Sequence, residues 1–248
     1  MAREIAKFIL VGLTLLGTAE AQSESVAYTS KYEPRLLPSE TEGTKANPVW
    51  YFQTHEGGIS NTSHGVLSAS TMHCPESDRL QFWQIGLDGE KEYGNPVESW
   101  TAATAEGVTI DFTIKVTDSH SDDIATSGVP GGFELLAASN GHAINIYFDT
   151  KGITAWGARI TMDDSHQNTE FKTYRLVIQD GKASLFEAGS NAAIFSELTM
   201  RPTAEGYSAI NFGTGTTTTS GAWELSFLGW NTKVAQLAPP PKMKIPQK

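Results

Sequence analysis

Apolar and polar residues alternate with a period of two along much of this chain, and this alternation is the strongest limit on its fold. From Val108 to Val116 every second side chain is apolar, with threonine, aspartate and lysine between them. Residues 142–149 (HAINIYFD) repeat the pattern. A period of two sends successive side chains to opposite faces of a β-strand, and no stretch of eleven residues carries the apolar stripe of a helix. The alternation therefore predicts an all-β protein.

Turn-forming residues divide these segments into short strands. Residues 173–189 (TYRLVIQDGKASLFEAG) hold two alternating runs around Asp180-Gly181, which is a strong hairpin signal. Residues 139–141 (SNG) and 150–152 (TKG) have the composition of turns. Further strands are expected at 131–139, 152–161, 207–213 and 222–230. Short antiparallel strands at this spacing indicate a β-sandwich or a β-barrel, and the length of the patterned region is that of a single domain.

The stretch GTGTTTTSG at 213–221 has three interpretations: a phosphate-binding loop, a linker or a connection between strands. A phosphate-binding loop needs a lysine followed by serine or threonine and then a helix, and this stretch has neither. A linker belongs at a domain boundary, whereas apolar strand-like segments (207–213 and 222–230) flank this stretch on both sides. It is therefore predicted to be the closing hairpin connection between the last two strands.

The two ends of the chain lack the pattern of the sandwich. Residues 1–21 combine a basic start, an apolar run and small residues at Ala19 and Ala21, which is typical of a secretory signal peptide. Residues 22–47 are polar, contain prolines and have no period, so a flexible leader is expected there. The globular β domain is expected at 48–234, followed by a proline- and lysine-rich tail at 235–248.

Composition limits the cellular compartment in which the protein is expected and the classes of partner that it can bind. No segment after the signal peptide reaches the roughly 20 apolar residues of a membrane-spanning helix, so we expect a secreted protein, extracellular or periplasmic, with no transmembrane segment. The net charge is −10, and the tail contributes lysines and no acid, so the acidity belongs to the domain. An acidic domain disfavours nucleic acid as a partner. Cys74 is the single cysteine of the chain, so no internal disulfide is expected.

Four segments together resemble the concanavalin A-like lectin/glucanase superfamily, specifically its laminin-G-like bacterial members. They are GVTIDFTIKV, GFELLAASNGHAINIYFDTKGI, TYRLVIQDGKASLFEAG and INFGTGTTTTSGAWELSFLGWNT. The resemblance covers residues 48–232 and implies a jelly roll whose partner is a polysaccharide or cell-surface glycan. It does not choose between lectins, hydrolases, lyases and adhesive modules, because one fold hosts many functions. The sequence lacks the paired-carboxylate strand of the glucanases and the Arg/Glu-rich and Gln-(Ile/Val)-His strands of the alginate lyases.

The residues between the apolar positions are expected to form the outward faces of the strands. They include amide, carboxylate and basic side chains, with aromatic rings nearby. Such a mixture binds sugars, because aromatic faces contact C–H surfaces and polar groups bond hydroxyls. A polar outward face is also ordinary for an antiparallel sheet. The ligand-binding candidates are Asp111, Lys115, Glu134, Asn145, Tyr147, Trp156, Arg175 and Glu224.

Two functions stay open for this face. The first is a non-catalytic carbohydrate-binding or adhesive module. The second is a small polysaccharide-degrading enzyme, either a glycoside hydrolase or a lyase. The catalytic candidates are Glu134, Tyr147, His142 and Arg175. A hydrolase needs two carboxylates at one cleft, and Glu134 with Asp111 or Glu224 would supply them.

A lyase needs a different set of side chains on the same face. A cation must neutralise the uronate carboxylate, and Arg175 or Lys115 is available for this role. A side chain must also remove a proton and another must return one, for which Tyr147 and His142 are the candidates.

Residues 117–123 (TDSHSDD) suggest a metal site. They place carboxylate oxygens at Asp118, Asp122 and Asp123 in a segment predicted to be a polar loop. The spacing differs from an EF-hand, which has glycine at position six and glutamate at position twelve. The resemblance implies calcium in such a loop, and a charged surface turn is the other interpretation.

Overall fold

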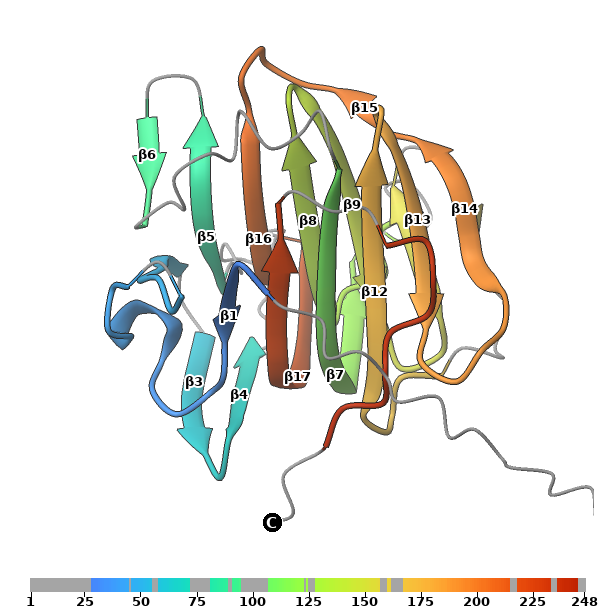
Figure 1. Cartoon of the computed structure of the whole chain (residues 1–248). Coiled ribbons are helices and arrows are strands. Elements are labelled where there is room, and N and C mark those ends of the chain that lie inside the picture. The colour runs from blue at the N-terminus through green and yellow to red at the C-terminus, as the bar shows by residue number, and fades with distance from the viewer. Residues whose placement is uncertain are drawn as a thin grey trace, which may run out of the picture.

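Two antiparallel β-sheets pack face to face in this protein (Figure 1). The computed structural model describes residues 28–44, 46–54, 58–71, 81–88, 91–94, 107–122, 124, 128–156, 160–161, 167–214, 218–232 and 236–244. The predicted signal peptide and Cys74 lie outside these residues. The arrangement confirms the predicted all-β sandwich of the jelly-roll type. No helix in the described ranges has the length and apolar composition of a membrane span.

The first sheet, here called sheet A, is built around two long strands. Its described strands are β1 (Ser30–Tyr32), β3 (Gly58–Ser63), β4 (Val66–Thr71), β7 (Val108–Ser121), β12 (Lys172–Gln179), β13 (Lys182–Glu187), β14 (Ala193–Thr199) and β17 (Thr219–Asn231). Their order in space is β14-β13-β12-β7-β17-β4-β3, and β1 pairs with the end of β17 beyond β4.

The second sheet, sheet B, consists of shorter strands. Its described strands are β2 (Tyr51–Thr54), β5 (Gln81–Asp88), β6 (Lys91–Tyr93), β8 (Phe133–Ser139), β9 (His142–Phe148), β10 (Ile153–Trp156), β11 (Ile160–Thr161), β15 (Arg201–Pro202) and β16 (Ser208–Thr214). The order is β11-β10-β9-β8-β16-β5-β2, with β15 beside β9 and β6 beside β5. Successive strands cross between the sheets repeatedly, so residues distant in the sequence share each face.

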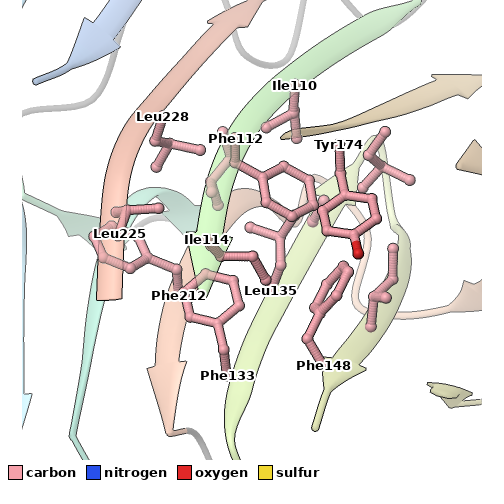
Figure 2. Close-up of a cluster of buried hydrophobic side chains, with 14 of the residues drawn as sticks. Ile110, Phe112, Ile114, Phe133, Leu135, Phe148, Tyr174, Phe212, Leu225 and Leu228 are labelled. Atoms are coloured by element: carbon pink, nitrogen blue, oxygen red, sulfur yellow. The ribbon is translucent and has the colours of Figure 1, made fainter. Parts of the chain in front are cut away.

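The alternation seen in the sequence produces the core between the sheets. Ile110, Phe112 and Ile114 of β7 point inward and are fully buried. They meet Phe133 and Phe148 from sheet B (Figure 2). The ring centroids of Phe112 and Phe148 lie 5.4 Å apart at an interplanar angle of 79°, an edge-to-face contact that is favourable for aromatic rings. The burial of these rings holds the two sheets together.

The two-residue turns follow their local chemistry. Asp180 and Gly181 join β12 to β13 with φ angles of 51° and 68°, and Asn140 and Gly141 join β8 to β9 with φ angles of 49° and 75°. A turn with two positive φ angles matches the right-handed twist of the strands, and it requires residues such as aspartate, asparagine and glycine. Both turns predicted from the sequence are confirmed.

The connection GTGTTTTSG differs from the prediction in one respect. It does link the last two strands, since β16 ends at Thr214 and β17 begins at Thr219. However, β16 belongs to sheet B and β17 to sheet A, so the stretch carries the chain from one sheet to the other. The two strands therefore do not form a hairpin. Thr214 supports this crossing, because its hydroxyl donates to the carbonyl of Gly132 and accepts from Trp223 Nε1 at 3.3 Å.

Part of the predicted leader belongs to the sandwich. Ser30–Tyr32 forms β1 and pairs with Leu228–Trp230 of β17. The Tyr32 ring is fully buried, and its hydroxyl donates to the carbonyl of Leu36 at 2.8 Å. Alternation over only three residues is too short to be recognised in the sequence, so strand β1 was not predicted.

The core contact of Phe112 gives a first prediction. Phe112→Ala removes a fully buried ring from between the sheets and should lower the free energy of unfolding by about 3–5 kcal/mol. Ile59→Ala on β3, where the side chain is 60% exposed, should change it by less than about 0.5 kcal/mol. Urea denaturation followed by tryptophan fluorescence measures both values. Equal losses in the two variants would contradict this core assignment.

Candidate functional site

The ligand-binding candidates divide between the outer faces of two different sheets. Asp111, Lys115, Arg175 and Glu224 lie on β7, β12 and β17 of sheet A. In contrast, Glu134, Asn145 and Tyr147 lie on β8 and β9 of sheet B. Trp156 ends β10 of sheet B, and its side chain lies outside the described part of the structure. The sequence pattern placed all of them on outward faces, but the sandwich separates them into two groups.

On sheet A, Asp111 and Arg175 form a buried ion pair. They stand opposite each other on β7 and β12, and Arg175 donates from Nε to Asp111 Oδ1 and from Nη2 to Oδ2, each at 2.7 Å. The exposed fraction is 0% for Asp111 and 3% for Arg175. Tyr28 donates from its hydroxyl to Asp111 Oδ2 at 2.7 Å, and Arg175 Nη1 donates to the carbonyl of Ala238. The terminal segments thus cover the pair, and a dissolved ligand cannot reach it.

Lys115 and Glu224 form a second, looser contact on sheet A. They stand opposite each other on β7 and β17, with 4.0 Å between Lys115 Nζ and Glu224 Oε2. The ammonium group also lies 6.0 Å from the centre of the Phe171 ring. The two opposite charges therefore lie close enough to attract each other.

On sheet B, a polar cluster formed by Glu134, Asn145, Tyr147 and Arg201 lies on the face away from the core. Asn145 donates from Nδ2 to Glu134 Oε1 at 2.5 Å, and Arg201 Nη2 donates to Asn145 Oδ1 at 3.4 Å. Glu134 stands opposite Tyr147 in the sheet. Burial raises the pKa of the Tyr147 phenol, and the nearby Glu134 carboxylate raises it further, against the opposing charge of Arg201. Tyr147 is therefore a protonated donor at neutral pH.

Arg201 was missed by the sequence reasoning. It lies on the two-residue strand β15, opposite Ala143 of β9. A strand of two residues has no recognisable alternation, so its outward arginine carried no signal.

A row of amide side chains extends the polar cluster across sheet B. The register places Tyr51, Gln84, Asn211, Leu136 and Asn145 side by side on five consecutive strands, β2, β5, β16, β8 and β9. Asn211 Oδ1 is buried without a hydrogen-bond partner within the described ranges. Tyr51, at the edge of the sheet, is 44% exposed. We call this set the amide row.

The amide row was also absent from the sequence candidates. Gln84 and Asn211 alternate with buried Trp83 and Phe212, which is a detectable signal. Their alignment depends on the register between β5 and β16, which the sequence does not specify.

The catalytic sets proposed from the sequence are not assembled. For the hydrolase, Glu134 lies on sheet B, whereas Asp111 and Glu224 lie on sheet A. For the lyase, Arg175 is buried on sheet A, far from Tyr147 in the fold because the core lies between the sheets.

His142 does not join Tyr147 either. It starts β9, five residues before Tyr147, so the two side chains point to opposite faces of the strand. His142 Nδ1 lies 3.2 Å from the carbonyl oxygen of Asn140, and the ring lies beside Gly181 in the turn of sheet A.

The expected calcium loop is largely strand. β7 continues to Ser121 because its end pairs with the start of β17, with Ser121 opposite Thr219. Asp118 Oδ1 accepts from the amide of Ser119, and Asp122 Oδ1 lies 3.1 Å from His120 Nε2. Asp123 lies outside the described residues. In the described ranges no three histidine, cysteine or acidic side chains gather in a metal-binding arrangement.

No family model matches the sequence, and no curated protein matches it. The structure is similar to a Bacillus licheniformis β-glucanase, with 9% identity, a TM-score of 0.46, and coverage of 84% of this chain and 99% of that chain. It is similar to the alginate lyase AlyA1 of Zobellia galactanivorans, with 11% identity, a TM-score of 0.44, and coverage of 72% and 82%. For the binding domain of botulinum neurotoxin serotype G these values are 10%, 0.43, 85% and 49%.

This chain thus spans about half the length of the neurotoxin chain. At such low identity the similarity concerns the fold alone, and the strand pairing described above defines that fold independently.

The buried pair on sheet A gives a second prediction. Asp111→Asn leaves the Arg175 cation buried without its counter-charge and should lower the free energy of unfolding by about 3–5 kcal/mol. Glu197→Gln breaks an exposed ion pair with Lys182 in the same sheet and should cost less than about 1 kcal/mol. Chemical denaturation at neutral pH compares them, and a loss below 1 kcal/mol for Asp111→Asn would refute the role given to the pair.

Three buried tyrosines and the partly buried Tyr28 give a third prediction. Burial is the main cause that raises the pKa of Tyr28, Tyr32, Tyr147 and Tyr174 above the ordinary value. The folded state therefore keeps these phenols protonated, while the unfolded chain releases their protons near pH 10. Stability should be independent of these groups below about pH 10 and should fall as the pH rises above it. Denaturation midpoints from pH 8 to pH 12 measure this, and a midpoint constant across the range would contradict it.

Proposed function

We propose that the outer face of sheet B binds an extracellular polysaccharide and that the protein is a secreted carbohydrate-binding or adhesive module. The observation that carries this proposal is the amide row, which aligns Gln84, Asn211 and Asn145 across the sheet with the exposed ring of Tyr51 at its edge. Amides donate and accept hydrogen bonds with sugar hydroxyls, and an aromatic ring stacks on the C–H face of a pyranose.

The polar cluster at the other end of the row supports binding more than catalysis. Glu134 is bonded to Asn145, and Tyr147 holds its proton at neutral pH because of burial and the adjacent carboxylate. A general base must be deprotonated at the working pH before it can accept a proton from the substrate, and Tyr147 does not meet this condition. No second carboxylate joins Glu134 among the described residues of this face. The cluster therefore fixes the orientation of Asn145, whose amide bonds to both Glu134 and Arg201.

Among the described residues, sheet A has no comparable row of amide side chains on its outer face. Its strongest polar group, the Asp111–Arg175 pair, is buried beneath the terminal segments, and Lys115 and Glu224 contact each other. Binding by a soluble polymer requires accessible groups, and on sheet B these are the ring of Tyr51, which is 44% exposed, and the partly exposed Asn211.

A polysaccharide panel tests the proposal and gives a fourth prediction. Neutral and uronate-containing polymers should retard the protein in affinity electrophoresis, without release of unsaturated or reducing products. For a polymer that retards the unaltered protein, Tyr51→Ala should weaken binding about 3- to 10-fold, because one stacking contact contributes about 0.5–1.5 kcal/mol. Asn211→Leu, which nearly conserves volume, should weaken it about fivefold through one lost hydrogen bond.

Ile59→Ala is the matched control, since it truncates an exposed side chain on the edge strand β3 of the other sheet. It should bind like the unaltered protein. Equal losses in Tyr51→Ala and Ile59→Ala would remove sheet B as the binding face. Formation of unsaturated or reducing products would reject the binding module in favour of a polysaccharide-degrading enzyme. Failure of every polymer to retard the protein would reject a glycan ligand.

A further inference from the structure

The Asp111–Arg175 pair lies on the outer face of its sheet, yet both side chains are shielded from water. Buried charges are costly unless all their hydrogen-bonding groups are satisfied. Here the carboxylate accepts three hydrogen bonds, two from Arg175 and one from Tyr28. The third guanidinium nitrogen, Nη1, donates to the carbonyl of Ala238 at 3.2 Å. The pair is thus satisfied by groups from both ends of the chain, about 210 residues apart along the sequence.

The C-terminal segment 236–244 follows the outer face of sheet A without joining its ladder (Figure 1). It contacts side chains of the sheet. The backbone N–H of Gln236 donates to Thr109 Oγ1 at 3.0 Å, and Arg175 Nη1 donates to the carbonyl of Ala238. Pro240 is buried, and the Lys242 side chain lies over Gly189, where a Cβ would come within 3.2 Å of Lys242 Cε. Prolines lack the N–H that a strand would need, so the segment does not extend the sheet and docks through the Gln236 N–H, the Ala238 carbonyl and the buried Pro240 ring.

The N-terminal segment reaches the same pair from another side. The Tyr28 ring packs on Phe227 with 5.2 Å between centroids, and the amide of Thr29 donates to the carbonyl of Trp230 at 2.9 Å. Gly229 leaves room for this ring, since a Cβ there would come within 2.9 Å of Tyr28 Cδ1. Tyr28 is therefore specifically accommodated next to Asp111.

We propose that Asp111 and Arg175 form a docking site on sheet A for the extended, proline-containing C-terminal segment, and that Tyr28 completes this site, so that the two ends of the chain stabilise each other's position. The physical link is water exclusion. If Tyr28 no longer covers Asp111, water enters, the ion pair is weakened, and Arg175 holds the Ala238 carbonyl less firmly. The same reasoning applies in the other direction, because coupling between two binding events is reciprocal.

Limited proteolysis of the full-length protein tests the coupling and gives a fifth prediction. Lys242 and Lys244 are trypsin sites within the docked segment. Tyr28→Phe removes only the hydroxyl that donates to Asp111. It should raise the rate of cleavage at Lys242 and Lys244 about tenfold, because the Asp111–Arg175 pair loses one hydrogen bond to a charged group. Cleavage after Lys115, which lies inside the central strand β7, reports global unfolding in the same digest and should not change.

Tyr32→Phe is the matched control. It removes a hydroxyl from the same N-terminal segment, but that hydroxyl donates to the carbonyl of Leu36 and not to Asp111. It should leave tail cleavage unchanged. Equal tail cleavage in Tyr28→Phe and Tyr32→Phe would overturn the proposal.

The reverse direction is tested by Thr109→Val, which removes the acceptor of the Gln236 amide at nearly constant volume. It should accelerate cleavage at Lys242 and also hydrogen exchange at the Thr29 backbone amide, because both terminal segments dock on sheet A beside the same ion pair. Faster tail cleavage with unchanged exchange at Thr29 would show that the two ends dock independently and would refute the coupling.

Discussion

The pairing of β7 with β17 is the constraint on which the rest of the structure depends. These are the two longest strands, and their register runs from Thr109 opposite Asn231 to Ser121 opposite Thr219. Strands of this length direct one row of side chains to the core and another to the outside. Sheet B covers the inner row, which includes Phe112 and Ile114, and the terminal segments cover part of the outer row, which includes Asp111. The central strands of sheet A are therefore buried on both faces.

This double burial explains why the two outer faces differ. On sheet A the outward charges are paired and shielded, as the Asp111–Arg175 pair shows, so their hydrogen bonds contribute to the fold. On sheet B the outward groups of the amide row are neutral: Gln84 and Asn145 are buried, Asn211 is partly exposed, and the ring of Tyr51 at the edge is exposed. Neutral amides cost less to leave near water than to bury, and they gain by meeting hydroxyls. The polar cluster with Glu134 stabilises one end of this row.

Much of the fold could be predicted because its signals are local. The inward positions of β7, the turn at Asp180-Gly181 and the strand character on both sides of GTGTTTTSG all follow from a few neighbouring residues. Short elements escaped detection for the same reason. Ser30–Tyr32 and Arg201–Pro202 are too brief to show alternation, although Tyr32 is fully buried and Arg201 belongs to the polar cluster.

Alternation along each strand was enough to establish the all-β class and to separate inward from outward side chains, because a period of two is a property of the backbone itself. It could not tell which sheet an outward residue belongs to. Asp111 and Glu134 look equivalent along the chain, yet one is sealed under Tyr28 and the other borders the amide row. That difference arises from pairing between strands distant in sequence, which places β7 and β8 in opposite sheets and brings both ends of the chain to one ion pair.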